Sequence, residues 1–471
     1  MQASRLVIDL SPLRSSTPFR LVFAARVVSL LGIALTTVGV PWQVFDMTRS
    51  SLQVSVAAAV VGTTTFAGTL AGGVIADRFD RRTVILLSRG GATLVFAALA
   101  LNALLPAPQL WLIYLCVGLN GATAVSQSAL MAVTPAIVAR EQLAAAGALV
   151  ALSTQIGAVV GPSLAGLLIA GPGLAVNFAL CALGSFVTTA LLWFLPSLPP
   201  QGAPTTHPLQ SISEGASFVA RHPVVRGVLL IDVAAMVFAL PYVLFPQLAI
   251  EVFAAGPQAA GLLYTAPAVG AMVAALTSGW TTHVHHSGRV LVASVLAYGA
   301  AIAGVGFAGS LPVALALLAV AGACDMVSEV LRRALLAHCT PDHLQARVSG
   351  VWLAQATVGP SAGGVEAGVA ARLLGPGPAI ATGGAVCVVA TAALATSLPP
   401  LRRVSLRADE WAAHPPEPAP GVPERSPLEP EADIEIEAGV EGTADDPVEG
   451  ALAGADADGE RGDGPDEATG R

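Results

Sequence analysis

The stretch that decides the fold class runs from Gln53 to Arg82 and reads QVSVAAAVVGTTTFAGTLAGGVIADRFDRR. Its first 24 residues carry no charge. A helix of about 20 mostly apolar residues crosses the ~30 Å hydrocarbon core of a bilayer. Two aspartates and three arginines follow at once, as they do where a chain leaves a membrane. The stretch therefore predicts a transmembrane helix that ends in a charged loop.

Eleven further segments resemble this one in length and composition. Only 11% of the 471 residues are charged, against about 25% in a soluble domain, and the mean hydropathy is +0.71. Because a helix satisfies its own backbone in lipid and no strand pattern occurs, we predict an all-α membrane protein with twelve transmembrane helices. The predicted spans are Phe19–Phe45, Gln53–Ala76, Val84–Leu105, Gln109–Ala132, Ala145–Ala170, Gly173–Leu195, Val224–Ala249, Ala259–Thr282, Val290–Gly309, Pro312–Ala337, Val348–Leu373 and Ala379–Leu398.

The longest internal polar break divides these spans six and six. We predict an amino-terminal six-helix half at residues 1–196, a cytoplasmic linker at 197–223 and a carboxyl-terminal six-helix half at 224–400. From Asp409 to Arg471 the chain carries nineteen acids and three arginines, a net charge of −16, which leaves +8 on the remainder. Residues 401–471 contain few large apolar side chains, and we predict a disordered acidic cytoplasmic tail.

Arginines mark alternate connections between the predicted spans. Arg78, Arg81, Arg82 and Arg89 flank the second connection, and further arginines flank the fourth, sixth, eighth and tenth. An excess of arginine is typical of cytoplasmic loops. We therefore predict that both termini of this multi-pass protein lie in the cytoplasm.

A glycine-proline pattern recurs in the two predicted halves. The fifth span carries Gly157, Gly161, Pro162 and Gly166, and the eleventh carries the pair Gly359-Pro360. Small residues let helices approach closely, and a proline removes a helix hydrogen bond and permits a bend. Repeats of this kind are an architecture of secondary transporters. Tight helix packing without any transport role is the alternative explanation.

The charged loop after the second span carries Gly73, Asp77, Arg78, Arg81 and Arg82. This spacing resembles the signature of the major facilitator superfamily between its second and third spans. The resemblance implies a conformational latch, in which these charges clamp a partner in one conformer and release it in the other. Asp80 stands where the family usually has a glycine.

The resemblance extends along the membrane body from about residue 10 to residue 398. Val40-Pro41, Gly72-Gly73-Val74 and Gly350-Val351-Trp352 are similar to segments of the bacterial siderophore exporters that handle enterobactin. The resemblance implies a secondary active transporter in the bacterial inner membrane, a proton-coupled exporter of a siderophore or another amphipathic small molecule. Tyr242 departs from that pattern, because those exporters carry an arginine there.

Six residues within the predicted spans are candidates for coupling or for lining the substrate cavity, since a charge inside a membrane needs a partner or a cavity. Asp232 and Asp325 have no base within a helical turn and are the candidate proton carriers. Glu329 can pair with Arg332 or Arg333 on its own helix, which would make it structural. The full set is Arg26, Asp232, Tyr242, Asp325, Glu329 and Glu366.

No P-loop or H-E-x-x-H motif occurs, so we expect no enzymatic activity and no cofactor or metal. The expected partners are a small-molecule substrate, the proton gradient and the lipid bilayer, with no nucleic acid, and we expect a monomer. Two alternatives are a multidrug efflux pump of the same superfamily and a non-transporting solute sensor that signals through the acidic tail.

Overall fold

A computed structural model describes residues 9–126, 130, 133, 137–195, 208–279 and 286–406. Within these ranges the chain is helical, and no strand occurs in them. The predicted disordered tail lies almost wholly outside the described residues, as does the first part of the predicted linker. The all-helical class expected from the sequence is confirmed.

The helices are α1 (Ser11–Ser15), α2 (Thr17–Thr48), α3 (Ser51–Arg78), α4 (Arg81–Leu104), α5 (Leu110–Ala122), α7 (Leu143–Ala170), α8 (Leu174–Trp193), α9 (Pro208–Arg221), α10 (Pro223–Phe238), α11 (Phe245–Gln247), α12 (Pro257–Leu276), α13 (Ser287–Val305), α14 (Leu311–Cys339), α15 (Asp342–Leu374), α16 (Pro376–Ser397) and α17 (Pro399–Arg403).

Ten helical segments of the described part are long and apolar enough to cross a membrane. α5 is shorter, with 13 residues, and the predicted fourth span continues into residues outside the described ranges. α15 has 33 residues but is more polar and is not among the ten. The protein is thus a multi-pass membrane protein, and the number twelve stays a prediction.

Polar side chains and turns fix where the helices begin. The Ser16 hydroxyl accepts a hydrogen bond from the amide of Phe19 at the start of α2. The Asp80 carboxylate caps α4 in the same way, so the aspartate in the charged loop is a helix cap. Gly173 and Gly375 both have positive φ, 97° and 85°, and precede α8 and α16, the last long helices of the two predicted halves.

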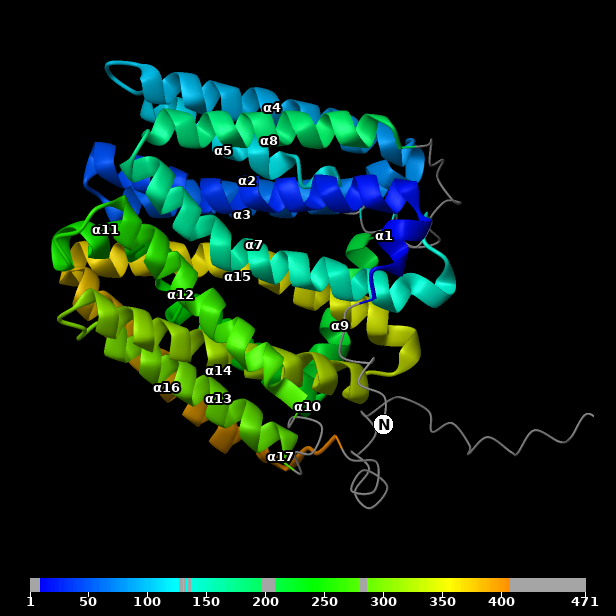
Figure 1. Ribbon diagram of the computed structural model, residues 1–471. Helices are drawn as coiled ribbons and strands as arrows, with labels where there is room; N and C mark the ends of the chain where they lie inside the picture. Colours follow the sequence, from blue (N-terminus) through cyan, green and yellow to red (C-terminus); the bar gives the residue numbers. More distant parts are fainter. Residues whose placement is uncertain are drawn as a thin grey trace, which may run out of the picture. The chain divides into compact units, whose positions relative to one another are not determined.

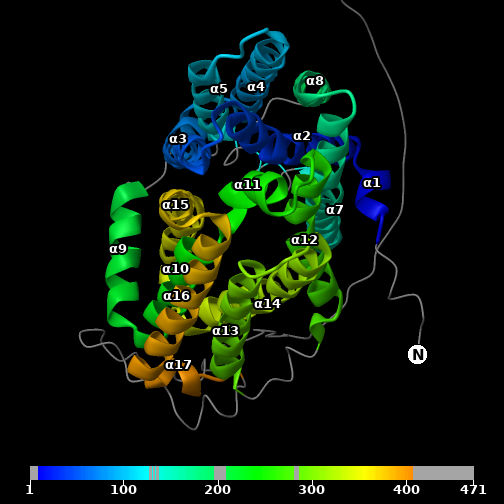
Figure 2. The ribbon, with the colours of Figure 1, turned by 90° about the vertical axis from the view of Figure 1, so that its left-hand side faces the viewer.

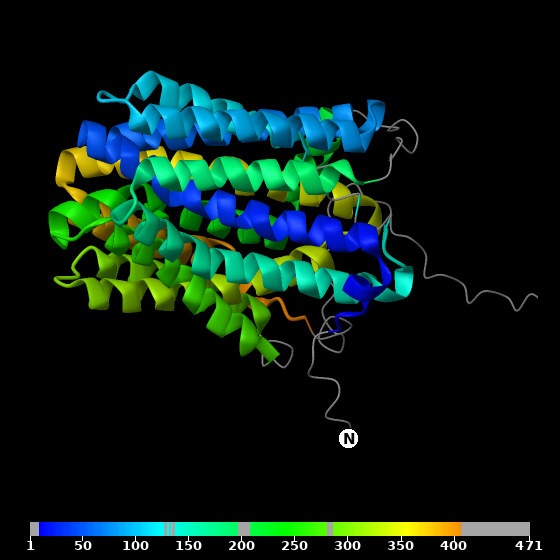
Figure 3. The ribbon, with the colours of Figure 1, turned by 45° about the horizontal axis from the view of Figure 1, so that its top comes forward.

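The long helices form two groups that lie side by side (Figure 1). The amino-terminal group contains α2, α3, α4, α5, α7 and α8, and the carboxyl-terminal group contains α10 and α12 to α16. Within the first group α2 packs against both α7 and α8, and Figure 3 shows the three running alongside one another. We call the end where α1, α9 and α17 lie the α9 end, and the opposite one the α11 end (Figure 1).

The two groups meet along two seams, α3 against α15 and α7 against α12 (Figure 2). Glycines allow these close approaches, since a Cβ on Gly368 would lie 1.9 Å from the Ser55 hydroxyl. A Cβ on Gly261 would lie 2.5 Å from the carbonyl oxygen of Pro162. Ser55 also donates a hydrogen bond to the carbonyl of Gly364 at 2.6 Å. These contacts join the groups toward the α11 end.

The predicted seventh span is not one continuous helix. α10 ends at Phe238, and the chain resumes as a 3-10 turn at Pro241–Leu244. Proline has no amide hydrogen, and its ring excludes the preceding residue from helical geometry, which accounts for Leu240 at φ −113° and ψ 81°. The span predicted at Val224–Ala249 thus matches the candidate span Pro223–Val252, but its helix is interrupted at Leu240.

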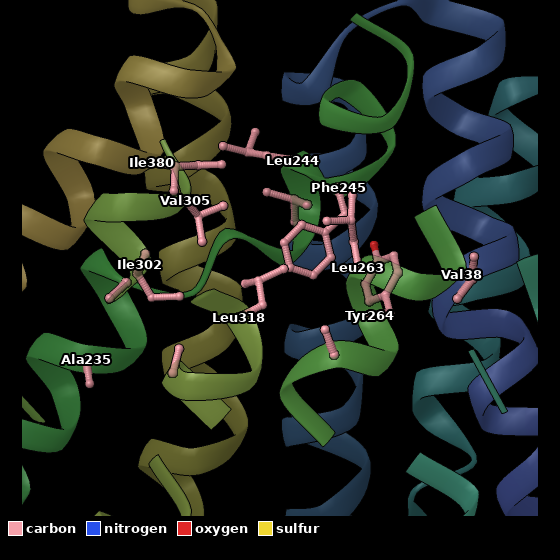
Figure 4. Close-up of a cluster of buried hydrophobic side chains, with 14 of the residues drawn as sticks. Val38, Ala235, Leu244, Phe245, Leu263, Tyr264, Ile302, Val305, Leu318 and Ile380 are labelled. Atoms are coloured by element: carbon pink, nitrogen blue, oxygen red, sulfur yellow. The ribbon is translucent and has the colours of Figure 1, made fainter. Parts of the chain in front are cut away.

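Apolar packing holds the segment after this break in place. Figure 4 shows Leu244 and Phe245 among Leu263, Tyr264 and Leu318 of the neighbouring helices. Each of these side chains is almost wholly buried. Within a bilayer the close van der Waals packing of these side chains, and not their removal from water, fixes the otherwise irregular segment.

Candidate functional site

Two cavities lie between the helix groups and share four lining residues. The main cavity has a volume of about 550 Å³ and is lined mostly by apolar side chains with several threonines. The Asp325 cavity, about 380 Å³, lies between α2, α7, α12 and α14. The residues common to both are Ile33, Thr37, Tyr242 and Tyr264. Together the cavities offer room for an amphipathic molecule, since ligand pockets span about 300–1,000 Å³.

A third and smaller cavity opens off the main one inside the amino-terminal group. It has a volume of about 180 Å³ and is lined by Arg89 of α4 together with small polar side chains. We call it the Arg89 cavity. It shares Ile33, Thr65, Phe96 and Asn120 with the main cavity, so the two are contiguous.

Two tyrosine hydroxyls donate to carbonyls at the break after α10, where the Tyr242 carbonyl also accepts from the Phe245 amide. The Tyr298 hydroxyl donates to the Ala239 carbonyl at 2.6 Å, and the Tyr264 hydroxyl donates to the Tyr242 carbonyl at 2.8 Å. The Tyr242 ring packs 5.4 Å from that of Phe245 and 6.0 Å from that of Tyr264. Tyr242, a predicted cavity residue, thus lines both cavities from the 3-10 turn after α10.

The acids Asp232 and Asp325 share one arginine. Arg332 of α14 forms an ion pair with Asp232 of α10, and its other terminal nitrogen lies 3.5 Å from Asp325. Gln355 of α15 donates to Asp232 at 2.7 Å. The Asp232 side chain is only 1% exposed, whereas that of Asp325 is 51% exposed and faces its cavity.

This arrangement corrects the view of both acids as lacking a base. No arginine stands within a helical turn of either, but Arg332 reaches Asp325 from two turns away and Asp232 from another helix. Glu329 pairs with Arg333 on its own helix, as the structural reading expected. Arg332 was missed as a site residue because it was assigned to Glu329 by spacing alone.

The other two predicted cavity residues lie elsewhere. Arg26 of α2 is exposed, and it makes one long contact of 3.4 Å to the Thr154 hydroxyl of α7, which lines the Asp325 cavity. Glu366 is half-buried toward the α11 end of α15 and lines none of these three cavities. Arg89, expected beside a loop, instead lies two turns inside α4.

The charged motif, which runs from the end of α3 to the start of α4, makes contacts within the amino-terminal group. Arg82 donates to the carbonyl of Trp193 at 2.5 Å, and its guanidinium lies 5.7 Å from the Trp193 ring centroid. A cation is favourable there, at the carboxyl end of α8. Gly73, the small residue of the motif, has open space around it, and the close helix approach occurs at Gly72, where a Cβ would lie 2.7 Å from the Val125 carbonyl. The Asp77 side chain lies outside the described part.

The glycine-proline motif lies at helix contacts. A Cβ on Gly161 would lie 2.1 Å from Ala34 of α2, and one on Gly166 would lie 2.7 Å from the Pro257 carbonyl across the α7–α12 seam. Gly157 faces Leu30 of α2.

The two residues of the equivalent pair in α15, Gly359 and Pro360, face different neighbours. Gly359 faces Met236 near the end of α10, while Pro360 lines the main cavity. The motif thus combines close packing with one wall of the cavity.

Comparison with known proteins gives consistent results. The transmembrane secretion effector family matches residues 8–428. The chain is 37% identical over 407 residues to the enterobactin exporter EntS of Citrobacter koseri, covering 86% of this chain and 97% of that protein. It is 38% identical over 380 residues to the enterobactin exporter EntS of an Escherichia coli strain, covering 80% and 90% of the two chains.

Solved structures show the same fold at low identity. The nucleoside transporter NupG superposes with a TM-score of 0.64 at 13% identity, covering 80% of this chain and 98% of that one. A human organic anion transporter superposes with a TM-score of 0.56 at 17% identity, covering 80% and 98%.

Proposed function

Because the chain belongs to the transmembrane secretion effector family of major facilitator transporters, we propose that it exports a siderophore of the enterobactin type from the cell. The chain is a multi-pass membrane transporter and not an enzyme. The observation that carries the proposal is the 37% identity to an enterobactin exporter over 97% of that exporter's length. Twelve spans in two halves and a place in the bacterial inner membrane belong to the same proposal.

The conformation indicates which end of the protein is closed. The groups are joined toward the α11 end by hydrogen bonds from Ser55 to Gly364 and from Ser51 to Gln247. Toward the α9 end, α7 and α12 diverge (Figure 1). Since the arginine-rich connections lie at the α9 end, we place it in the cytoplasm, so that this conformer takes its substrate from the cytoplasm.

Proton coupling is the second part of the proposal, and Asp325 is the residue we assign to it. Its carboxylate is half exposed to the cavity and holds only a share of Arg332, because the buried Asp232 takes the closer ion pair. Protonation of Asp325 would break its contact with Arg332, and Arg332 would then be neutralised by Asp232 alone. Asp232 then has a structural role, with Arg332 and Gln355 as its partners.

The apolar main cavity favours a second candidate, a multidrug efflux pump. Its wall is built mainly from valines, alanines, prolines and aromatic rings, and such a surface discriminates weakly among amphipathic molecules. Ethidium, a planar amphipathic cation, is a suitable probe for this alternative.

Transport by the full chain in proteoliposomes tests the proposal. Enterobactin should cross the membrane when a proton gradient is imposed and should stop when the gradient is collapsed by an ionophore. Liposomes without protein are one control. The other is the oxidised double variant Ala58→Cys with Gly364→Cys, because these residues of α3 and α15 face each other across the seam. Movement of ethidium but not of enterobactin would favour the multidrug pump, and movement of neither under any gradient would contradict export.

A further inference from the structure

Two arginines of the amino-terminal group, Arg26 and Arg89, have no acid to neutralise them among the side chains that the structure describes. None of the ion pairs formed among the described residues includes Arg26 or Arg89. The acids of residues 10–196 are Asp46, Asp77, Asp80 and Glu141, all at helix ends. Arg89 stands eight residues into α4, which is about 12 Å at 1.5 Å per residue. Isolated charges at such depth are costly in a membrane protein and usually mark a functional site.

Arg89 is held so that part of its guanidinium is available. One terminal nitrogen donates to the Ser29 hydroxyl at 2.9 Å, while the buried Nε has no hydrogen-bond partner among the described residues. Ser185 fixes the backbone beneath it by donating to the Arg89 carbonyl at 3.0 Å. A guanidinium offers five donors in a planar fork that fits an oxyanion in bidentate fashion. The Arg89 cavity therefore has spare donors and an unmatched charge.

Arg26 adds a second positive charge at this place. Arg26 stands on α2 one helical turn before Ser29, the hydrogen-bond partner of Arg89, and it also reaches toward Thr154 on the wall of the Asp325 cavity. Two like charges in a medium of low dielectric constant destabilise each other unless an anion lies between them. A bound anion would offset both the repulsion and the missing hydrogen bond.

We propose that Arg89, assisted by Arg26, forms an anion subsite that holds the acidic group of the exported molecule. The inference rests on the proposed function and specifies its substrate class: an aromatic or amphipathic body in the main cavity, with a carboxylate or ionised phenol in the Arg89 cavity. The shared residues Thr65 and Asn120 join the two cavities, so one molecule can occupy both. Asp325, which shares Arg332 with Asp232, lines the other cavity and is assigned to the proton.

Binding of two nearly isosteric probes tests the subsite on the purified full chain. Sodium salicylate carries an aryl carboxylate, and salicylamide is its neutral counterpart. Salicylate should raise the unfolding temperature in a concentration-dependent way, with salicylamide weaker by about tenfold or more, the loss of one charge-assisted pair. Arg89→Gln and Arg26→Gln should each weaken salicylate binding and leave salicylamide unchanged, and Arg89→Lys should keep part of the salicylate affinity.

Arg372→Gln is the matched control, because Arg372 is exposed at the far end of α15. Equal binding of the two probes, no binding of salicylate to the native chain, or native affinity in Arg89→Gln would each overturn the inference. If Arg89→Gln fails to fold, Arg89→Lys and Arg26→Gln decide the question. Binding in detergent does not require transport. If the chain binds salicylate but moves no enterobactin, the export proposal alone is contradicted. If Arg89→Gln exports enterobactin at the native rate, the anion subsite alone is contradicted.

Discussion

Arg332 is the residue on which the charge balance of the carboxyl-terminal group depends. It reaches Asp232 from one side and Asp325 from the other, so one cation serves two acids on different helices. Both Arg332 and Asp232 are almost wholly buried, at 7% and 1% side-chain exposure. Loss of either partner leaves a charge in a site that water does not reach.

The Asp232→Asn and Arg332→Gln single variants should therefore unfold at lower temperature than the native chain. Removing one partner of a buried pair costs roughly 3–5 kcal/mol, and the double variant should recover part of that loss. The measurement is a double-mutant cycle by thermal unfolding in detergent. Glu329→Gln with Arg333→Gln is the matched control, an exposed pair expected to couple by only about 0.3–0.5 kcal/mol. Additive losses at Asp232 and Arg332 would contradict the pair.

Asp325→Asn should have the opposite pattern, with folding preserved and coupling lost. The carboxylate faces the cavity and has the weaker hold on Arg332, so an amide fits in its place. Gradient-driven export should stop while exchange of substrate between the two sides continues. Both rates are measured in proteoliposomes with labelled enterobactin. Full gradient-driven export by Asp325→Asn would remove this residue from the coupling proposal.

At the level of elements, the break between α10 and α11 gives the cavity its irregular wall. A continuous helix would use the Ala239 carbonyl internally, and here the Tyr298 hydroxyl donates to it instead. The Tyr264 hydroxyl adds a second hydrogen bond to the Tyr242 carbonyl, which also accepts from the Phe245 amide. Irregular backbone at membrane depth is tolerated where it lines a cavity and its polar groups are satisfied.

Tyr298→Phe should destabilise the protein by about 1–3 kcal/mol, because the Ala239 carbonyl stays buried and loses its donor. Thermal unfolding in detergent measures the loss. Tyr114→Phe is the control, since the Tyr114 hydroxyl bonds the Gln53 side chain on a half-buried surface where water can replace it. Equal stability of the two variants would show that the carbonyl finds another partner.

The charged loop between α3 and α4 is the second element with an expected effect. Asp77→Asn should sharply reduce export and leave the amount of folded protein in the membrane unchanged, because the motif is proposed to clamp only one conformer. Asp80→Asn is the control, since asparagine also caps a helix and α4 should still begin there. Uptake into inverted vesicles measures export. Unchanged export in Asp77→Asn would reduce the motif to a charged loop.

Features that depend on neighbouring residues could be predicted from the sequence, whereas contacts between residues far apart in the chain could not. Apolar length predicted the long helices, because the need to satisfy the backbone in lipid is local. Pro241 was visible and could have predicted the break, but apolar length concealed it. The partner of Arg332 could not be read from spacing, because Asp232 lies one hundred residues away on another helix. Arg89 was misread as a loop residue for a similar reason, since its cavity is built from five helices.

At the scale of the whole molecule, export requires the seams toward the α11 end to open, because the two groups can release a substrate on that side only by separating there. Ala58 of α3 faces Gly364 of α15, and a Cβ on Gly364 would lie 3.7 Å from that of Ala58, a separation suited to a disulfide. In a background with the five native cysteines replaced, Ala58→Cys with Gly364→Cys should form a cross-link on oxidation, abolish export, and regain it on reduction. Met236→Cys with Gly359→Cys is the control, at 3.3 Å within the carboxyl-terminal group, where a cross-link should leave the seam free. Full export by the oxidised Ala58–Gly364 pair, with the cross-link verified by mass spectrometry, would mean that this seam stays closed throughout the cycle.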